Sequence, residues 1–191
     1  MRSLPKTLLI LLIAALAGVG VYFGKDYLAQ KQLTDESTWT TVNESQFSIT
    51  VPSCMKKGTM LTSMNSDTQH ICFYTSQFAG FDVNYYQFSS EEKEMAAGLT
   101  AKDYEDFLGL GTRKINDQEI IFTAREDKNY IFAEYKRHAI NHVASTDDVW
   151  YMESMFPTDD GYYLVNTYCA MEKKAEVRDL MLKWLDSFRV K

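Results

Sequence analysis

Residues 149–169 read Val-Trp-Tyr-Met-Glu-Ser-Met-Phe-Pro-Thr-Asp-Asp-Gly-Tyr-Tyr-Leu-Val-Asn-Thr-Tyr-Cys. The residues on either side of the central turn are mostly aromatic or aliphatic, which is typical of strands. Between them, Pro157–Gly161 gathers Pro, Asp and Gly, the residues that turns prefer. The stretch therefore predicts a hairpin of two long antiparallel strands.

Upstream of this hairpin, five further stretches have strand character, and they cover residues 47–51, 70–75, 81–88, 119–124 and 130–135. In the first of them, three apolar residues alternate with two hydroxyl residues, the period-two pattern of a half-buried strand. Pro52 ends that strand, and turn residues separate it from the next one. The first two strands are therefore expected to pair as a hairpin.

Helical patterns occur in the middle of the chain and at its end. Ser89, with Glu92 three residues later, forms a capping box that opens a helical stretch, which Gly98 and Thr100 divide into residues 90–97 and 101–108. Near the end, apolar residues recur at steps of three and four, and they are Val177, Leu180, Met181, Trp184, Leu185 and Phe188. We therefore predict an α+β domain with a mostly antiparallel sheet and flanking helices, preceded by one N-terminal hydrophobic helix.

The segment Thr7–Gly24 contains no charged residue, and as a helix it would be about 27 Å long, close to the thickness of a bilayer core. The residues assigned to the membrane span are Thr7, Leu8, Leu9, Ile10, Leu11, Leu12, Ile13, Val19 and Val21. Arg2 and Lys6 precede it and Lys25 and Lys31 follow it, so the Lys/Arg count is balanced. The N-terminal amine and the usual behaviour of leading segments favour an N-terminus that stays in the cytoplasm. Two interpretations stay open, an uncleaved membrane anchor and a signal peptide cleaved after residues 15–17.

The chain is therefore divided into a signal anchor, transmembrane helix or signal peptide (1–25), a linker (26–38) and an α+β domain outside the cytoplasm (39–191). If the leader is cleaved, the domain is secreted or periplasmic. Removing Arg2, Lys6 and Lys25 from the 20 Lys+Arg leaves 17 against 26 Asp+Glu, a net charge of −9 for residues 26–191. This balance disfavours nucleic acid and anionic membrane surfaces as partners.

The chain has three cysteines, Cys54, Cys72 and Cys169. In an oxidising compartment, one disulfide with one spare thiol is the simplest arrangement. A bridge between Cys54 and Cys72 is the expected pairing, and it would contribute roughly 3 kcal/mol in the chain-entropy account. Cys169 lies in an apolar strand and is expected to be a small buried hydrophobe.

No motif predicts a catalytic centre or a cofactor. The spacing of His138 and His142 would suit one metal ion on a helix, but the surrounding sequence indicates the end of a strand and a loop, so both are expected at the surface without a metal. The strands carry a set of large side chains that could line a pocket, although most are expected in the core: Tyr85, Tyr86, Trp150, Tyr151, Met152, Met155, Tyr162 and Tyr163.

The order of these elements resembles a known fold. Phe47–Pro52 as an opening strand, followed by hairpins, a helical region, long aromatic strands and a closing amphipathic helix, is similar to the PsbP-type fold. That fold includes the extrinsic PsbP subunit of photosystem II, a Ran-binding nuclear import factor and small bacterial envelope proteins. The resemblance implies a binding or assembly role and assigns no catalytic residue.

Three functions are compared on this basis. The first is a non-enzymatic protein, anchored or exported, whose domain binds a protein partner or a small ligand at the cell envelope. The second is a thiol- or histidine-dependent enzyme of the envelope, resembling a hydrolase. The third is a structural subunit of a membrane complex that makes its contacts through the N-terminal helix.

Overall fold

The computed structural model describes residues 24–25, 27–59, 68–115, 118–138 and 148–191. The residues predicted to span a membrane, from Thr7 to Val21, lie outside these ranges. Within the described ranges, no helix is both long enough and apolar enough to cross a bilayer. The anchor therefore stays a prediction.

A seven-stranded antiparallel sheet forms the centre of the domain, with the strand order β3-β4-β5-β11-β10-β9-β8. The predicted central hairpin is confirmed, because β10 and β11 pair from Val149↔Ala170 to Thr158↔Gly161. The strands of this sheet are β3 (Lys56–Lys57), β4 (Thr68–Thr75), β5 (Ala79–Gln87), β8 (Thr123–Arg125), β9 (Tyr130–His138), β10 (Asp148–Thr158) and β11 (Gly161–Ala170).

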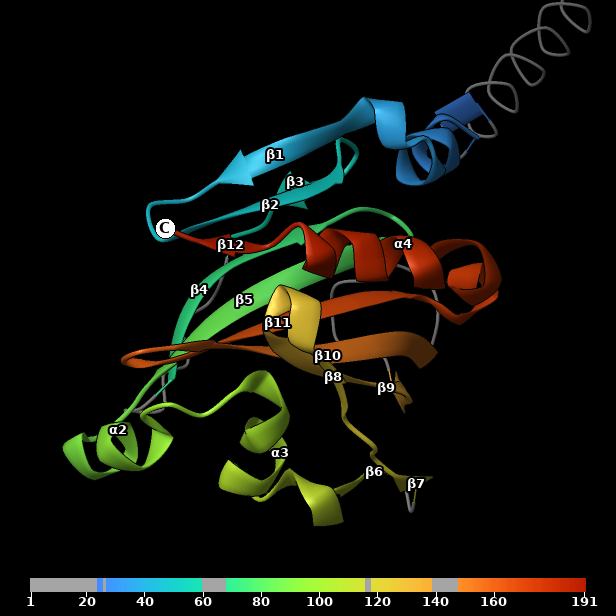
Figure 1. Ribbon diagram of the computed structural model, residues 1–191. Coiled ribbons are helices and arrows are strands. Elements are labelled where there is room, and N and C mark those ends of the chain that lie inside the picture. The colour runs from blue at the N-terminus through green and yellow to red at the C-terminus, as the bar shows by residue number, and fades with distance from the viewer. Residues whose placement is uncertain (1–23, 26, 60–67, 116–117, 139–147) are drawn as a thin grey trace, which may run out of the picture.

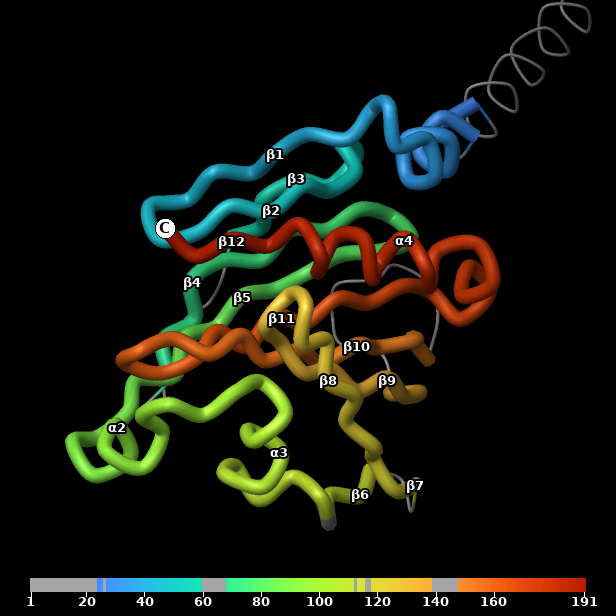
Figure 2. The backbone as a smooth tube through the Cα atoms, viewed as in Figure 1, coloured from blue at the N-terminus to red at the C-terminus, as the bar shows by residue number. Residues whose placement is uncertain are grey.

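A second sheet has three strands in the order β1-β2-β12, formed by β1 (Trp39–Asn43), β2 (Phe47–Pro52) and β12 (Arg189–Val190). The predicted pairing of residues 47–51 with residues 70–75 is wrong, because β2 pairs with β1 and β12 while β4 pairs with β3 and β5. Alternation showed that 47–51 is half-buried, but one of its partners comes from the far end of the chain, where β12 returns beside it (Figure 2).

The helices confirm the predicted local signals. The α2 helix (Ser90–Ala96) has its capping box, in which the Glu92 amide donates to Ser89 Oγ at 3.2 Å and the Ser89 amide donates to Glu92 Oε2 at 2.7 Å. The predicted helix 101–108 consists of η2 (Ala101–Asp103) and α3 (Tyr104–Phe107). The last long helix is α4 (Lys174–Asp186), which follows η5 (Met171–Lys173).

The predicted strand 119–124 is wrong in its centre. Ile120 and Phe122 are buried while Ile121 is 73% exposed, yet these three residues form no strand in the structure. They connect two short strands, and the remaining short elements of this region and of the N-terminal side are η1 (Glu36–Thr38), η3 (Leu110–Thr112), β6 (Lys114–Ile115), β7 (Gln118–Glu119) and η4 (Glu126–Lys128). Two buried side chains alone therefore account for the strand-like alternation.

The seven-stranded sheet has a hydrophobic core on each face (Figure 1). On one face, α4 and the three-stranded sheet cover the strands, and Val177, Met181, Trp184 and Leu185 of α4 are fully buried there. On the other face, the α2 and α3 region packs on the strands through residues such as Phe88 and Tyr104. The central strands are thus covered on both sides, as expected of a layered α+β domain.

The segment predicted as a linker contributes to the first core. Residues 27–34 are helical and Leu33 is only 1% exposed within the cluster beneath α4. Gln30 links this helix to the start of α4, because its Nε2 donates to Glu176 Oε2 at 2.8 Å and its Oε1 accepts from Lys173 Nζ at 3.0 Å. The boundary at residue 39 stays a prediction.

Replacing Leu33 with Ala is expected to lower the free energy of unfolding by about 2 kcal/mol, because it removes buried methyl groups from the main core. The loss of stability should lie at the lower end of the range for Leu→Ala in a core, because the helix 27–34 is at the edge of the domain and can shift into the cavity that the change leaves. Urea denaturation of the full chain measures it, and Leu28→Ala is the control because Leu28 is 57% exposed. Equal effects of the two changes would contradict the packing of Leu33.

Candidate functional site

Three polar side chains lie next to one another across the centre of the large sheet, and we call Asp82, Asn166 and Glu153 the polar row. The strand register pairs Asn166 with Asp82 on one side and with Glu153 on the other. Phe81 and Val83 pack in the core under α4, so Asp82 between them points to the opposite face. The polar row therefore lies on the face that also carries α2 and α3.

Buried tyrosines border the polar row on one side. Tyr135, Tyr151 and Tyr168 are directly paired across β9, β10 and β11, and each is at most 3% exposed. The ring centroids of Tyr135 and Tyr151 are 5.5 Å apart, and those of Tyr151 and Tyr168 are 6.5 Å apart. The carboxylates of the row are thus held beside aromatic rings, where a charge is poorly solvated.

Asp82 carries the most unusual carboxylate of the polar row. Its Oδ1 accepts hydrogen bonds from the side-chain amides of Asn84 at 2.7 Å and Asn166 at 2.9 Å. Burial nevertheless raises the pKa of Asp82 from 3.8 to about 6, with the negative charge of Glu153 adding to the effect and the two amides and Arg137 opposing it. This carboxyl can therefore take up or release a proton near neutral pH.

Glu153 has a fuller set of partners than Asp82. It is 5% exposed, its Oε1 accepts from Arg113 Nη1, and its Oε2 accepts from the Tyr135 hydroxyl at 2.7 Å. Burial, and then the adjacent Glu153 charge, raise the pKa of Tyr135 above its ordinary value of 10. The Arg113–Glu153 pair thus anchors the segment after η3 to the centre of the sheet.

The polar row offers proton exchange but little further chemistry. Apart from its two carboxylates it contains no nucleophilic side chain, and its residues line none of the three pockets near the described residues. The buried oxygen Asn166 Oδ1 has no hydrogen-bond partner in the described part of the chain. We therefore interpret the row as a buried polar network of the fold.

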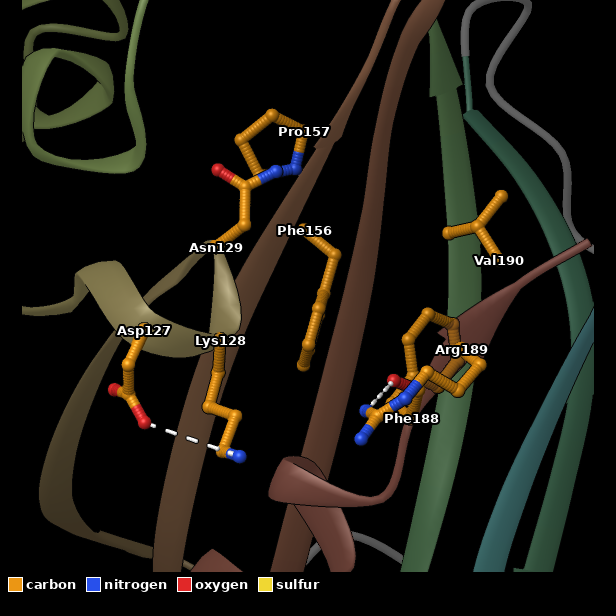
Figure 3. Close-up of a pocket in the computed structure, with 8 residues that line it drawn as sticks. All are labelled: Asp127, Lys128, Asn129, Phe156, Pro157, Phe188, Arg189 and Val190. Atoms are coloured by element: carbon orange, nitrogen blue, oxygen red, sulfur yellow. Dashed lines mark hydrogen bonds and ion pairs between the residues drawn. The ribbon is translucent and has the colours of Figure 1, made fainter.

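A groove opens at one end of the sheet and forms the best candidate for a binding site. Its first part is a pocket of about 420 Å³ between η4 and β12 (Figure 3). The rings of Phe156 and Phe188 form its floor, with centroids 4.6 Å apart. The lining residues are Asp127, Lys128, Asn129, Phe156, Pro157, Phe188, Arg189 and Val190.

The second part of the groove is an adjoining pocket of about 480 Å³ that shares Asn129 and Pro157 with the first. Its other lining residues come chiefly from the α2 region and from the β10–β11 turn, and they are Lys93, Ala96, Ala97, Gly98, Leu99, Tyr104, Thr158 and Asp159. Asn129 stands at the junction in the left-handed conformation, with φ of 53°, which Asn tolerates better than most residues. The two pockets therefore adjoin at Asn129 and Pro157, and together they are called the groove.

The charges of the first pocket are unevenly compensated. Asp127 lies 3.6 Å from Arg125 and 3.9 Å from Lys128, so two cations share this carboxylate. Arg189 makes no ion pair with any described residue, and its Nη1 donates to the backbone oxygens of Asp186 at 2.8 Å and Phe188 at 2.6 Å. The pocket thus presents net positive charge in a domain that is otherwise acidic.

The three cysteines are free thiols in the structure, so the Cys54–Cys72 disulfide stays a prediction. Burial raises the pKa of Cys72 to about 12, with a smaller effect of the Glu44 charge, and burial raises the pKa of Cys169 to about 12. Burial also raises the pKa of Cys54. Cys169 is fully buried, as predicted. Because the thiolate is the reactive form, these environments disfavour a thiol enzyme.

In the reduced folded protein, the thiols are therefore expected to react slowly with an alkylating reagent at pH 7, with Cys54 the fastest because it is the least buried of the three. Iodoacetamide labelling followed by peptide mass spectrometry measures each rate. A thiol that reacts as fast as a free cysteine would contradict this prediction. The same samples, denatured without reductant, test the disulfide: one free thiol per chain supports it and three exclude it.

The histidines give no metal centre among the described residues. His138 is exposed at the end of β9, and its Nδ1 lies 2.8 Å from Asp148 Oδ1. His142 lies outside the described residues. In the ranges that are described, no three His, Cys, Asp or Glu side chains gather as metal ligands would. The position of His138 on a strand also removes the helical spacing that would align it with a residue four positions later.

The aromatic set divides between core and surface. Tyr151, Met152, Met155 and Tyr163 are buried, as predicted, whereas Tyr85, Tyr86, Trp150 and Tyr162 are partly exposed. The sequence did not identify the groove, because its walls come from three separate segments and its residues form no motif. Asp82 was missed as well, since a polar residue that alternates with apolar ones indicates a solvent-facing position.

Comparisons with known proteins place the fold. No family model matches the chain, and no curated protein matches it. Among solved structures, the chain is similar to the solution structure of cyanobacterial PsbP (CyanoP) from Synechocystis sp. PCC 6803, with a TM-score of 0.50 and 13% identity over 81% of this chain and 93% of that one. The predicted PsbP-like resemblance is thus confirmed for the fold.

Proposed function

We propose that this protein is a non-enzymatic binding domain, held at or exported across a membrane by its N-terminal segment, and that it binds a partner protein through the groove. The observation that carries this proposal is the first pocket, where Lys128 and Arg189 border an aromatic floor. The two rings are 5% and 3% exposed, so they offer a small aromatic floor beside an arginine, and both residue types are enriched at protein interfaces. The accessory roles known for PsbP-type proteins agree with this choice.

The position of the groove is suited to a tethered domain. In Figure 1, β12 and α2 lie at one end of the domain, and the helix 27–34 lies at the other. A domain attached to a membrane through its N-terminal segment would therefore hold the groove away from the attachment point. Export to an extracytoplasmic compartment rests on the uncharged segment Thr7–Gly24 and on the two basic residues before it.

Crosslinking of the full chain in its native membranes tests the proposal. The wild-type protein is expected to give a discrete crosslinked species, and the double variant Lys128→Glu/Arg189→Glu should reduce its yield at least tenfold by reversing both charges at the pocket. The control is Lys31→Glu/Lys102→Glu, two exposed lysines outside the groove, which should crosslink like the wild type.

Two outcomes would overturn the proposal. One is equal crosslinking by the groove variant and the control, which would place the contact elsewhere. The other is turnover of a substrate by the purified chain that Cys54→Ser, Cys72→Ser or His70→Gln abolishes, which would support the enzymatic alternative instead.

A further inference from the structure

We infer that the groove binds an extended, acidic segment of the partner, which adds as a strand to the free edge of β12. This inference rests on the proposed function and names the kind of partner. It requires an unpaired strand edge, side-chain contacts that favour an extended chain, and a charge that selects acidic residues. Each of these is present at the groove.

Within the described part of the chain, one edge of β12 is unpaired, because β12 is the last strand of the three-stranded sheet and its one neighbour there is β2. Arg189 and Val190 of this strand line the first pocket. In an antiparallel pair, alternate residues direct their N–H and C=O groups away from the neighbour, so the outer edge of β12 has backbone groups available for another chain. Addition of a strand to such an edge is a common mode of peptide recognition.

A strand of two residues supplies few hydrogen bonds, so side chains must provide most of the affinity. Val190 is 45% exposed at the mouth of the first pocket, and the second pocket adds apolar surface from Ala96 and Leu99. Side chains two residues apart on an extended chain lie about 7 Å apart on one face. A single extended segment can therefore place side chains in both pockets, which adjoin at Asn129 and Pro157.

The carboxamide of Asn129 suits the junction between the pockets. It lies beside Pro157 in Figure 3, where a peptide passing from one pocket to the other would cross it. An amide has both a donor and an acceptor, and it can therefore pair with a peptide backbone of any sequence. This contact would favour an extended main chain over a compact ligand.

The charge at the first pocket selects an acidic segment. Arg189 has no ion pair among the described residues and Lys128 has only the 3.9 Å contact with Asp127. An Asp or Glu side chain of the partner would lie between these two cations and could form a bidentate pair with the guanidinium. A basic segment would instead meet two like charges.

A selection experiment tests the inference. The probe is a phage library of random eight-residue peptides, applied to the full chain in nanodiscs, with the Lys128→Glu/Arg189→Glu protein used to subtract background binders. Peptides that survive should be enriched at least fivefold in Asp or Glu at one position and depleted in Pro around it, because Pro cannot donate to a strand edge. Binding should slow amide hydrogen exchange at Val190.

The inference is overturned if no sequence is enriched, if basic or Pro-rich peptides are selected, or if bound peptides leave exchange at Val190 unchanged. Failure here and failure of the proposed function give different results. If the groove variant loses the crosslinked partner while no acidic peptide is selected, the groove binds a folded surface and only this inference fails. If crosslinking also survives the groove substitutions, both fail.

Discussion

Replacing Arg113 with Met is expected to lower the free energy of unfolding by about 3 kcal/mol at pH 7, because the change leaves the buried carboxylate of Glu153 without its cation. Among the described residues, the Tyr135 hydroxyl, at 2.7 Å, would then be the only hydrogen-bond donor to that charge. Met keeps most of the length and apolar contact of the arginine stem, so the loss reports on charge more than on packing. Urea unfolding followed by circular dichroism measures it.

The matched control removes the charge on both sides. In Arg113→Met/Glu153→Gln no uncompensated charge remains, and most of the lost stability should return, since replacing a whole buried ion pair is often nearly neutral. The single change Glu153→Gln should cost less than Arg113→Met, because Arg113 is partly exposed and water can solvate it. A loss below about 0.5 kcal/mol for Arg113→Met would show that water already reaches Glu153.

Local signals in the sequence predicted much of the fold. The hairpin of β10 and β11 followed from a turn of Pro, Asp and Gly between two apolar stretches, and α4 followed from six apolar residues at helical spacing. The capping box at Ser89 was equally local. Each of these elements is determined by residues within about twenty positions of one another, so a single sequence suffices to find it.

Pairing across long separations could not be predicted in the same way. Alternation indicates that β2 is half-buried, but the hydrophobic pattern does not identify β12, more than a hundred residues later, as its neighbour. The groove could not be predicted for the same reason. Its walls come from η4, the end of β10 and the segment after α4, which are far apart in the sequence and meet only in the folded chain. Neither Asn129 nor Arg189 carries a local signal of binding.

The pH dependence of folding provides the last prediction. Replacing Asp82 with Asn is expected to raise the free energy of unfolding by about 2 kcal/mol at pH 7. The wild-type carboxyl has a pKa of about 6, so it is ionised at pH 7 although its buried position disfavours the charge. The whole pKa shift from 3.8 to about 6 would correspond to about 3 kcal/mol of stability. The partial exposure of Asp82 reduces this expected value. Asn keeps a carbonyl oxygen to accept from Asn84 and Asn166.

The sign of this effect follows from a folded-state pKa that lies above the unfolded one. Near pH 4, the carboxyl is largely protonated in the folded protein and costs little, so wild type and Asp82→Asn should have nearly equal stability. As the pH rises through about 6, the carboxyl ionises in the folded protein and the wild type loses stability, while the variant has no such group to ionise. Thermal melts at pH 4, 5.5 and 7 should therefore show a difference that grows with pH.

Two comparisons show whether the polar row causes this dependence. Asp106→Asn, at an exposed position of α3, should change stability by less than about 0.5 kcal/mol at every pH. Glu153→Gln should weaken the pH dependence of the wild type, because the Glu153 charge is one cause of the raised pKa of Asp82. A difference in stability between wild type and Asp82→Asn that stays constant from pH 4 to 7 would mean that Asp82 is solvated in the folded protein.

Because the polar row lies apart from the groove, Asp82→Asn should also leave partner crosslinking unchanged. This result would separate the stability of the fold from its proposed function.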